Sequence, residues 1–352
     1  MAKVMRFLGY ENKTDISLST SFKMTSREYT YWSTQYLHSM SIHFYLCSVY
    51  IHTKIRNTMK KILLLLLTPM MLLSKPTVAL QILGSGGPES GDKRASSAYV
   101  VWIDGKSRVL VDFGGGASLR FEEVGAKIQD LDVILLTHLH VDHTADLPAL
   151  LKSSFFTRAS GKLHIYGPKN NKVMPSTEDF IDRLFENGDG AWQYLGDHLD
   201  GSASLQLKAH DVDESKKPKV IYAQDGIRIT AVSVHHGIIP AVAYRIDVGS
   251  KSITFSGDMN GDYHTLETLA KDTDILVAHN AVPQGASGVV TQLHMSPKTI
   301  GQVALSAKPK KLVLSHRMLR TLGKEKETKR EIRKYYKGNI RFANDKSFYR
   351  VR

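Results

Sequence analysis

The stretch THLHVDH at residues 137–143 constrains the chain more than any other part of the sequence. It ends the apolar run 132–137, which predicts a buried strand followed by a histidine-rich loop. His138 and His140 lie two positions apart at the end of an extended segment, so both side chains project in one direction. Imidazoles and carboxylates are the ligands that divalent zinc, manganese or iron prefers. A polar loop is the alternative interpretation, but four potential ligands within six residues favour a metal site. They are also more ligands than one ion needs if it keeps an open coordination position. The four residues are His138, His140, Asp142 and His143.

Three later strand ends supply further candidate ligands. They are His235 and His236 after the strand expected at 229–234, Asp258 after 252–256, and His316 after 311–314. A single Asp or His at a strand end is more often a cap or a turn residue. Because strand ends that meet loops are the usual edge for a site in a layered α/β fold, this series after the first motif favours one shared site.

The composition is that of a folded protein without disulfides. Of the 352 residues, 42% are apolar and 23% are charged, which excludes disorder over most of the chain. Cys47 is the single cysteine, so disulfide frameworks and Cys-rich zinc modules are excluded. The formal charge of +13 is uneven, since residues 80–314 carry 24 basic and 27 acidic side chains while residues 315–352 carry 13 and 4. The basic character therefore belongs to the C-terminal tail and not to a groove through the fold.

Apolar runs between turn residues predict a layered α/β architecture. Further strands are expected at 80–83, 98–103, 107–112, 163–166, 227–234, 241–247 and 275–278. A helix is expected over 296–307, where Ser296 can cap it and Pro297 takes the first helical position. The loop GSGGP at 84–88 is no dinucleotide fingerprint, because Glu89 stands where the pattern needs Gly. Strands in both halves favour an α/β sandwich of two helix-covered sheets over a doubly wound sheet.

The order of these motifs resembles the metallo-β-lactamase-fold hydrolases. H-x-H-x-D-H is followed by a His, then by Asp258, then by His316. Three further segments resemble the ribonuclease Z-like branch, which includes secreted arylsulfatase-like and phosphodiesterase-like members: GSGGP with 93–97, PAVAYR at 240–245, and LHMS at 293–296 before a helix. Ribonuclease Z itself usually shows Arg-Asn where this chain has Arg94 and Ala95. The resemblance covers residues 80–352 and implies one hydrolase domain, a four-layer αββα sandwich of the metallo-β-lactamase type.

The resemblance also implies a site for two divalent metal ions, with zinc expected and manganese or iron as alternatives. Carried over by position, one ion would be held by His138, His140 and His236, the second by Asp142, His143 and His316, and Asp258 would bridge them. His235 is the alternative to His236, because the spacing to Pro240 differs slightly from the family pattern. True lactamases of this fold usually carry a Cys at the second metal position. Residues 80–352 contain no Cys, which argues against lactam hydrolysis.

For catalysis, the resemblance implies that two metals supply a bridging hydroxide as the nucleophile. Asp142 would ligate and orient that water, and His294 would protonate the leaving group, the alternative being that His294 merely begins a helix. Asp112 is expected to accept a hydrogen bond from a ligand histidine, or else to be a simple turn residue. His279 lies where the family often has His-Glu. The next residue here is Asn280, which puts a role for His279 in doubt.

These features favour a hydrolase of small phosphodiesters or sulfate esters. A ribonuclease Z-type endonuclease is the second hypothesis, and a metal-dependent binding protein without turnover is the third. A transfer-RNA nuclease needs a basic arm, but residues 169–200 carry three basic and seven acidic side chains. Nucleic acid is therefore disfavoured as a partner. The basic run 324–337 is more typical of a solvated helix, and the resemblance makes a homodimer an expectation.

The N-terminal segment predicts secretion. Residues 59–79 combine Lys60 and Lys61, a short apolar stretch and the small-residue sequence TVA, which is the pattern of a signal peptide. The hypothesis is that translation starts at Met59, that residues 1–58 are an upstream extension outside the protein, and that the mature chain, residues 80–352, is periplasmic or secreted without a membrane anchor. The alternative is a real N-terminal extension followed by a buried or anchoring helix.

Overall fold

The computed structural model describes residues 50, 52–56, 58 and 75–352 of the chain. It separates into two units, residues 1–74 and residues 75–352. In the first unit, the described residues are helical. Most of the predicted extension 1–58 and signal segment 59–79 lies outside the described residues. Among the residues that are described, no helix has the length and apolar character needed to cross a membrane.

The first sheet of the second unit has seven strands in the order β14-β1-β2-β3-β4-β5-β6. Their bounds are β1 (Val78–Gly84), β2 (Ala98–Ile103), β3 (Lys106–Phe113), β4 (Val133–Leu135), β5 (Gly161–Pro168), β6 (Leu205–Val212) and β14 (Phe348–Val351). The strands from β14 to β3 pair antiparallel, and those from β3 to β6 pair parallel. Asp104 and Gly105 join β2 to β3 with φ values of 50° and 77°, the positive pair that an Asp-Gly hairpin turn requires.

The second sheet also has seven strands, in the order β13-β12-β11-β10-β9-β8-β7. Their bounds are β7 (Lys219–Gln224), β8 (Ile227–His236), β9 (Ile239–Val248), β10 (Lys251–Phe255), β11 (Ile275–His279), β12 (Lys311–Ser315) and β13 (Asn339–Phe342). Strands β7 to β10 pair antiparallel, and β10 to β13 pair parallel. Each sheet therefore has one antiparallel half and one parallel half.

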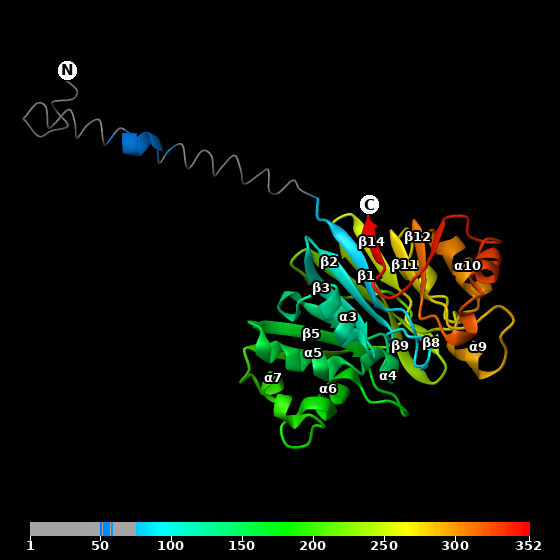
Figure 1. Ribbon diagram of the computed structural model, residues 1–352, viewed down its shortest axis with the longest axis horizontal. Coiled ribbons are helices and arrows are strands. Elements are labelled where there is room, and N and C mark those ends of the chain that lie inside the picture. The colour runs from blue at the N-terminus through cyan, green and yellow to red at the C-terminus, as the bar shows by residue number, and fades with distance from the viewer. Residues whose placement is uncertain (1–49, 51, 57, 59–74) are drawn as a thin grey trace, which may run out of the picture. The chain divides into compact units, whose positions relative to one another are not determined.

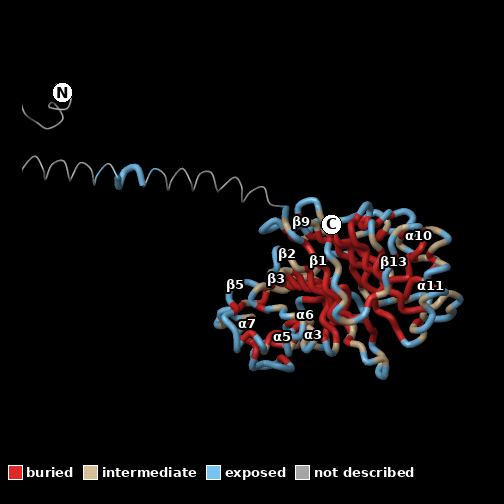
Figure 2. Tube along the Cα trace, turned by 45° about the horizontal axis from the view of Figure 1, so that its top comes forward, coloured by how far each residue is buried: buried red, intermediate tan, exposed pale blue. Residues whose placement is uncertain are grey.

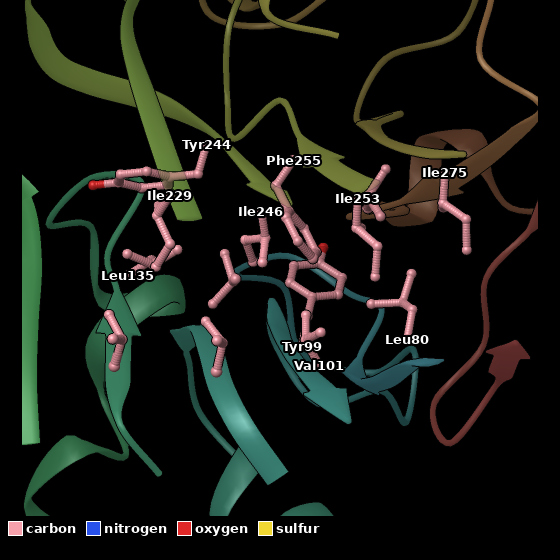
Figure 3. Close-up of a cluster of buried hydrophobic side chains, with 14 of the residues drawn as sticks. Leu80, Tyr99, Val101, Leu135, Ile229, Tyr244, Ile246, Ile253, Phe255 and Ile275 are labelled. Carbon is pink, nitrogen blue, oxygen red and sulfur yellow. The ribbon is translucent and has the colours of Figure 1, made fainter. Parts of the chain in front are cut away.

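Apolar side chains from the facing sides of the two sheets form the central core. Figure 3 shows Leu80, Tyr99 and Leu135 of the first sheet pointing toward Ile246 and Phe255 of the second. All five side chains are at most 1% exposed. Figure 2 shows this burial along the strands of both sheets, with exposed residues in the surrounding loops and on the outer sides of the helices.

Helices cover the outer face of each sheet (Figure 1). On the first sheet, α3 (Ala117–Glu123), α5 (Leu147–Ser153) and α6 (Thr177–Phe185) pack on a second apolar cluster. On the second sheet, α8 (Leu266–Leu269), α10 (Pro297–Ala307) and α11 (Glu325–Ile332) pack on a third. Shorter helices are α4 (Val141–Thr144), α7 (Asp197–Asp200) and α9 (Val289–Leu293). The layers follow the order helix, sheet, sheet, helix, so the predicted αββα sandwich is confirmed.

Local signals predicted ten of the fourteen strands, and the four exceptions lie within 205–224 and near the C-terminus. Ser296 caps α10 as expected, since its side chain accepts a hydrogen bond from the Thr299 amide. The basic run 324–337 forms α11, whose Ile332 is fully buried against the second sheet. Strands β6, β7, β13 and β14 were not predicted. The short strands β13 and β14 each contain one arginine and no continuous apolar run, and they pair with β12 and β1.

Candidate metal centre

The candidate site lies at the carboxyl-terminal ends of strands from both sheets. The H-x-H-x-D-H loop follows β4 and runs into α4, while His236 and His279 are the last residues of β8 and β11. Asp258 and His316 follow β10 and β12. Because β10, β11 and β12 are parallel neighbours, the residues that end them meet at one edge of the second sheet.

Five overlapping groups of three ligand-type side chains lie close together among the described residues, and two of them are those that the resemblance implies. His138, His140 and His236 each offer one ligand atom within 4.8 Å of the others, and Asp142, His143 and His316 do the same. Within the second group, His316 Nε2 lies 3.1 Å from Asp142 Oδ2. His138 Nε2 lies 3.0 Å from His140 Nδ1.

Asp258 lies between the two groups. Its Oδ2 atom is 3.9 Å from the Nε2 atoms of both His138 and His236. The same oxygen is 3.8 Å from His143 Nε2 and 3.4 Å from His316 Nε2. One carboxylate oxygen therefore faces imidazoles of both groups, which is the position that a bridging ligand requires.

Asp112 fixes the orientation of His143. Its Oδ2 atom accepts a hydrogen bond of 2.8 Å from His143 Nδ1, and its Oδ1 atom accepts one of 2.7 Å from the Thr137 amide. Nε2 of His143 is left facing Asp142 and finds no hydrogen-bond partner within the described chain. Burial opposes the charged imidazole, but the Asp112 and Asp142 carboxylates raise the pKa of His143 well above its usual value.

The two neighbouring histidines at the end of β8 have different surroundings. His236 donates through Nδ1 to the Leu293 carbonyl at 2.8 Å, which turns its Nε2 toward Asp258. His235 lies outside the cluster, since its ring packs on Tyr263 at 5.1 Å and its Nδ1 is 3.7 Å from Asp262. The structure thus brings the favoured residue, His236, into the cluster and leaves the alternative at its side.

His279 and Tyr99 hold Asp258 from behind. His279 Nδ1 donates to Asp258 Oδ1 at 2.7 Å, and the Tyr99 hydroxyl lies 3.0 Å from His279 Nε2. Because a carboxylate only accepts, His279 carries its proton on Nδ1 and accepts the Tyr99 hydroxyl on Nε2. Burial raises the pKa of Tyr99, so the phenol stays protonated. Sequence reasoning missed Tyr99, since a tyrosine on the buried face of a strand carries no signal of this contact.

His294 lies between α9 and α10 at the rim of the cluster. Its Nδ1 atom is 3.7 Å from Asp258 Oδ2 and has no hydrogen-bond partner in the part of the chain that is described. Its ring centre lies 5.5 Å from that of His236 and 5.7 Å from that of His316. Burial lowers the pKa of His294 to about 3.

Two glycines allow the loops of the site to approach each other closely. A Cβ atom on Gly114 would lie 2.0 Å from the carbonyl oxygen of Asp142, far inside contact distance. A Cβ atom on Gly87, in the GSGGP loop, would lie 2.9 Å from Cε1 of His316. The glycine-rich segments at 84–87 and 114–116 therefore shape the site by leaving room for its side chains.

The residues present fit divalent metal ions. Nε2 of His143 and of His236 are buried and unpartnered among the described residues, a state that is costly for polar atoms. Both face carboxylate oxygens at 3.5 to 3.9 Å, too far for a hydrogen bond. Two ligand atoms bound to one zinc ion at about 2.0–2.2 Å in tetrahedral geometry lie at about this separation.

This fold and this set of ligand-type side chains define a metal-dependent hydrolase of the metallo-β-lactamase fold. Residues 107–317 match the family described as Beta-lactamase superfamily domain, which is more than half of the chain. The chain belongs to that family.

Similar proteins agree with this assignment. The chain is 29% identical over 251 residues to a Ribonuclease Z of Mycobacterium sp. (strain KMS), covering 68% of this chain and 84% of the relative. The metallo-beta-lactamase fold protein YhfI from Bacillus subtilis superposes with a TM-score of 0.62 at 19% identity, covering 79% of this chain and 100% of YhfI. A diphosphatase from the PhnP family superposes with a TM-score of 0.57 at 20% identity, covering 78% and 97%. At these identities the two structural likenesses concern the fold alone.

Proposed function

We propose that the chain is a dinuclear metal-dependent hydrolase of phosphodiester or sulfate ester bonds. The observation that carries this proposal is the position of Asp258 between two groups of three ligand-type side chains. In this assignment His138, His140 and His236 hold one ion, and Asp142, His143 and His316 hold the other. Zinc is the expected metal, with manganese or iron as alternatives, because imidazole and carboxylate suit all three.

In the proposed mechanism, the residues of the cluster have separate roles. When bound, two divalent ions would lower the pKa of a water and neutralise charge on the ester oxygens. The Asp142 carboxylate accepts a hydrogen bond from the attacking water and orients it. His294 delivers a proton to the leaving oxygen. Because burial lowers the pKa of the imidazole to about 3, His294 is neutral before the reaction, and the proton that it passes to the leaving oxygen would be the one that the attacking water gives up.

Small esters are favoured over RNA by the segment 169–200. Its residues Ile181, Phe185 and Leu195 are buried in the apolar cluster on the first sheet, so much of the segment packs as part of the domain. Its charge is acidic, which repels a phosphate backbone. Ribonuclease Z-type cleavage remains the second candidate, supported by the name of the sequence relatives. A binding protein without turnover is disfavoured by the complete set of ligand-type residues.

Hydrolysis of two model esters tests the proposal. Purified, zinc-loaded protein should hydrolyse bis-p-nitrophenyl phosphate, p-nitrophenyl sulfate or both, and a chelator should abolish the activity. Metal analysis should give two ions per chain. Metal-loaded protein that cleaves neither ester but processes a transfer-RNA precursor would reverse the order of the candidates. Loaded protein that cleaves none of the three would favour the binding protein.

We infer that residues 59–79 direct the protein out of the cytoplasm, on the basis of their basic, apolar and small-residue pattern. Cleavage after Ala79 would remove Val78 and Ala79 from β1 and would keep residues 80–84 of the strand, in which Leu80 pairs with Val101 and Tyr349. Mass spectrometry of the native protein tests the inference. A mature N-terminus near Leu80 is expected, and peptides from residues 3–56 would contradict it.

A further inference from the structure

A groove with a volume of about 530 Å³ lies beside the metal-ligand cluster. One wall is formed by the loop 168–173 after β5, and the other by the hairpin that joins β8 to β9. His236 belongs to both features, since it lines the groove and directs Nε2 toward Asp258. The groove therefore adjoins the cluster at His236, the one member of the two groups of three that lines it, and its volume suits a small molecule.

Two aliphatic side chains lie at the rim of the groove, and a hydrogen bond links its two walls. Val173 and Ile238 line it from opposite walls and are 54% and 70% exposed, so each presents uncovered aliphatic surface. Asn171 links the two walls, since its Nδ2 donates to the Ile238 carbonyl at 2.9 Å. Within its own wall, its Oδ1 accepts a hydrogen bond of 2.8 Å from the Val173 amide. A ligand entering here meets a groove that is already formed.

An aromatic side chain, with charged side chains near it, also lines the groove. Tyr263 lines it beside His235, whose ring centre is 5.1 Å from that of Tyr263. The Lys216 ammonium, outside the lining, lies 4.0 Å from the centre of the Tyr263 ring. Lys172 adds an exposed positive charge to the lining, and Glu214 adds an exposed negative one. Aliphatic and aromatic surfaces next to cations suit a planar aromatic group on an anionic molecule.

The geometry points to this groove as the subsite for a planar aromatic group that the ester substrate carries, with Ile238 and Tyr263 as specificity-determining residues. The inference rests on the proposed function, because it places the reacting ester at the neighbouring cluster. Both an aryl group and a nucleobase offer this chemistry. His235 gains a role here as the residue that packs against Tyr263.

Three phosphodiesters with the same p-nitrophenolate leaving group test the subsite. They carry methyl, phenyl or thymidine as the second alcohol. Zinc-loaded wild-type protein should prefer the phenyl or the thymidine ester to the methyl ester by about tenfold in kcat/KM, since burying one aromatic group contributes roughly that factor. In Ile238→Ser and in Tyr263→Ala, kcat/KM for the preferred ester should fall about tenfold more than kcat/KM for the methyl ester. Leu305→Ser, an exposed position on α10, is the matched control and should keep the preference.

Each result decides the inference. A lost preference for the phenyl ester assigns the groove to aryl groups, and a lost preference for the thymidine ester assigns it to nucleobases. Equal losses for all three esters, or a preference that survives both substitutions, would overturn it. If neither these phosphodiesters nor p-nitrophenyl sulfate is cleaved, the proposed function fails, and calorimetric binding of phenylphosphonate against methylphosphonate still tests the groove. Tighter binding of the phenyl compound in wild type but not in Ile238→Ser supports it, and equal binding overturns it.

Discussion

Nδ1 of His279 lies 2.7 Å from Oδ1 of Asp258, and this contact sets the direction of the whole carboxylate. With Oδ1 held from behind, Oδ2 faces the imidazoles of both ligand groups. The same carboxylate, which only accepts, places the proton of His279 on Nδ1, and the Tyr99 hydroxyl, 3.0 Å away, donates to Nε2. Three buried side chains from β2, β11 and the loop after β10 thus form one hydrogen-bonded chain that ends at the Asp258 carboxylate, between the two groups of ligand-type side chains.

Breaking this chain should weaken metal binding without removing a ligand. His279→Ala frees Asp258 to rotate and should lower metal affinity by about 10- to 100-fold, the usual cost of losing a residue that orients a ligand. Tyr99→Phe removes only the hydroxyl and should cost less. Competition with a zinc chelator measures both. Tyr222→Phe, which removes a hydroxyl elsewhere in the central core, is the control and should leave affinity unchanged. Unchanged affinity in folded His279→Ala would remove the orienting role.

Removing Asp258 itself should change the number of ions. Asp258→Ala deletes the oxygen that faces both ligand groups, so the metal content should fall toward one ion per chain. Circular dichroism of the variant checks that the fold persists. Two ions retained in a folded Asp258→Ala variant would refute the bridging assignment.

The neighbouring histidines at the end of β8 provide a matched pair of substitutions. His236→Ala should lose metal and nearly all turnover, because it removes a nitrogen directed at Asp258. His235→Ala should keep both ions, because its ring lies against Tyr263 outside the cluster. Metal analysis and kcat/KM of the two variants, side by side, check the assignment. The reverse pattern would make His235 the ligand.

The sequence predicts the parts of the site that are local to strand ends. His138 and His140 lie together because they are two positions apart on an extended segment. His316 joins them because a short apolar run places it at the carboxyl end of a parallel strand. Such relationships depend on a few adjacent residues and on a fold class that the motif order already indicates.

Contacts between distant segments could not be predicted in the same way. Tyr99 and His279 are 180 positions apart, and their contact exists only because the two sheets stack. The close approach of Gly114 to Asp142 likewise depends on tertiary packing. Strand β14 has no apolar run of its own and is defined by its pairing with β1. In each case the contact depends on a second segment far away in the sequence, so the residues around one position cannot predict it.

Metal uptake should depend on pH differently in the two ligand groups. Burial lowers the pKa of His138, His140 and His236, so these imidazoles are neutral and ready to bind at neutral pH. Despite burial, nearby carboxylates raise the pKa of His143 and His316, so an ion in that group must displace protons. Its apparent affinity should rise by about tenfold per pH unit for each proton released.

Zinc titrations from about pH 6 to about pH 8 measure this difference. The stoichiometry at limiting zinc concentration should move from near one ion toward two as the pH rises. Calorimetry in buffers of different ionisation enthalpy should register proton release for the weaker ion only. If both ions bind with the same pH dependence, His143 and His316 are not protonated before the metal binds, and the prediction is wrong.

The role of His294 can be separated from that of a ligand by changing the leaving group. In the proposed mechanism His294→Ala keeps both ions, because the residue belongs to neither group of three, and metal analysis checks this first. An alkoxide leaving group has a high pKa and needs a proton, so esters of simple alcohols should slow by about 10²-fold or more. A p-nitrophenolate leaves without help, and its esters should slow far less. Comparing kcat/KM for both ester types in wild type and variant isolates the proton transfer from binding.

His264→Ala, an exposed histidine away from the cluster, is the control and should change neither rate. Equal losses for both ester types would mean that His294 binds substrate or only begins a helix, and a lost ion would instead make it a metal ligand, in keeping with its Nδ1 atom lying 3.7 Å from Asp258.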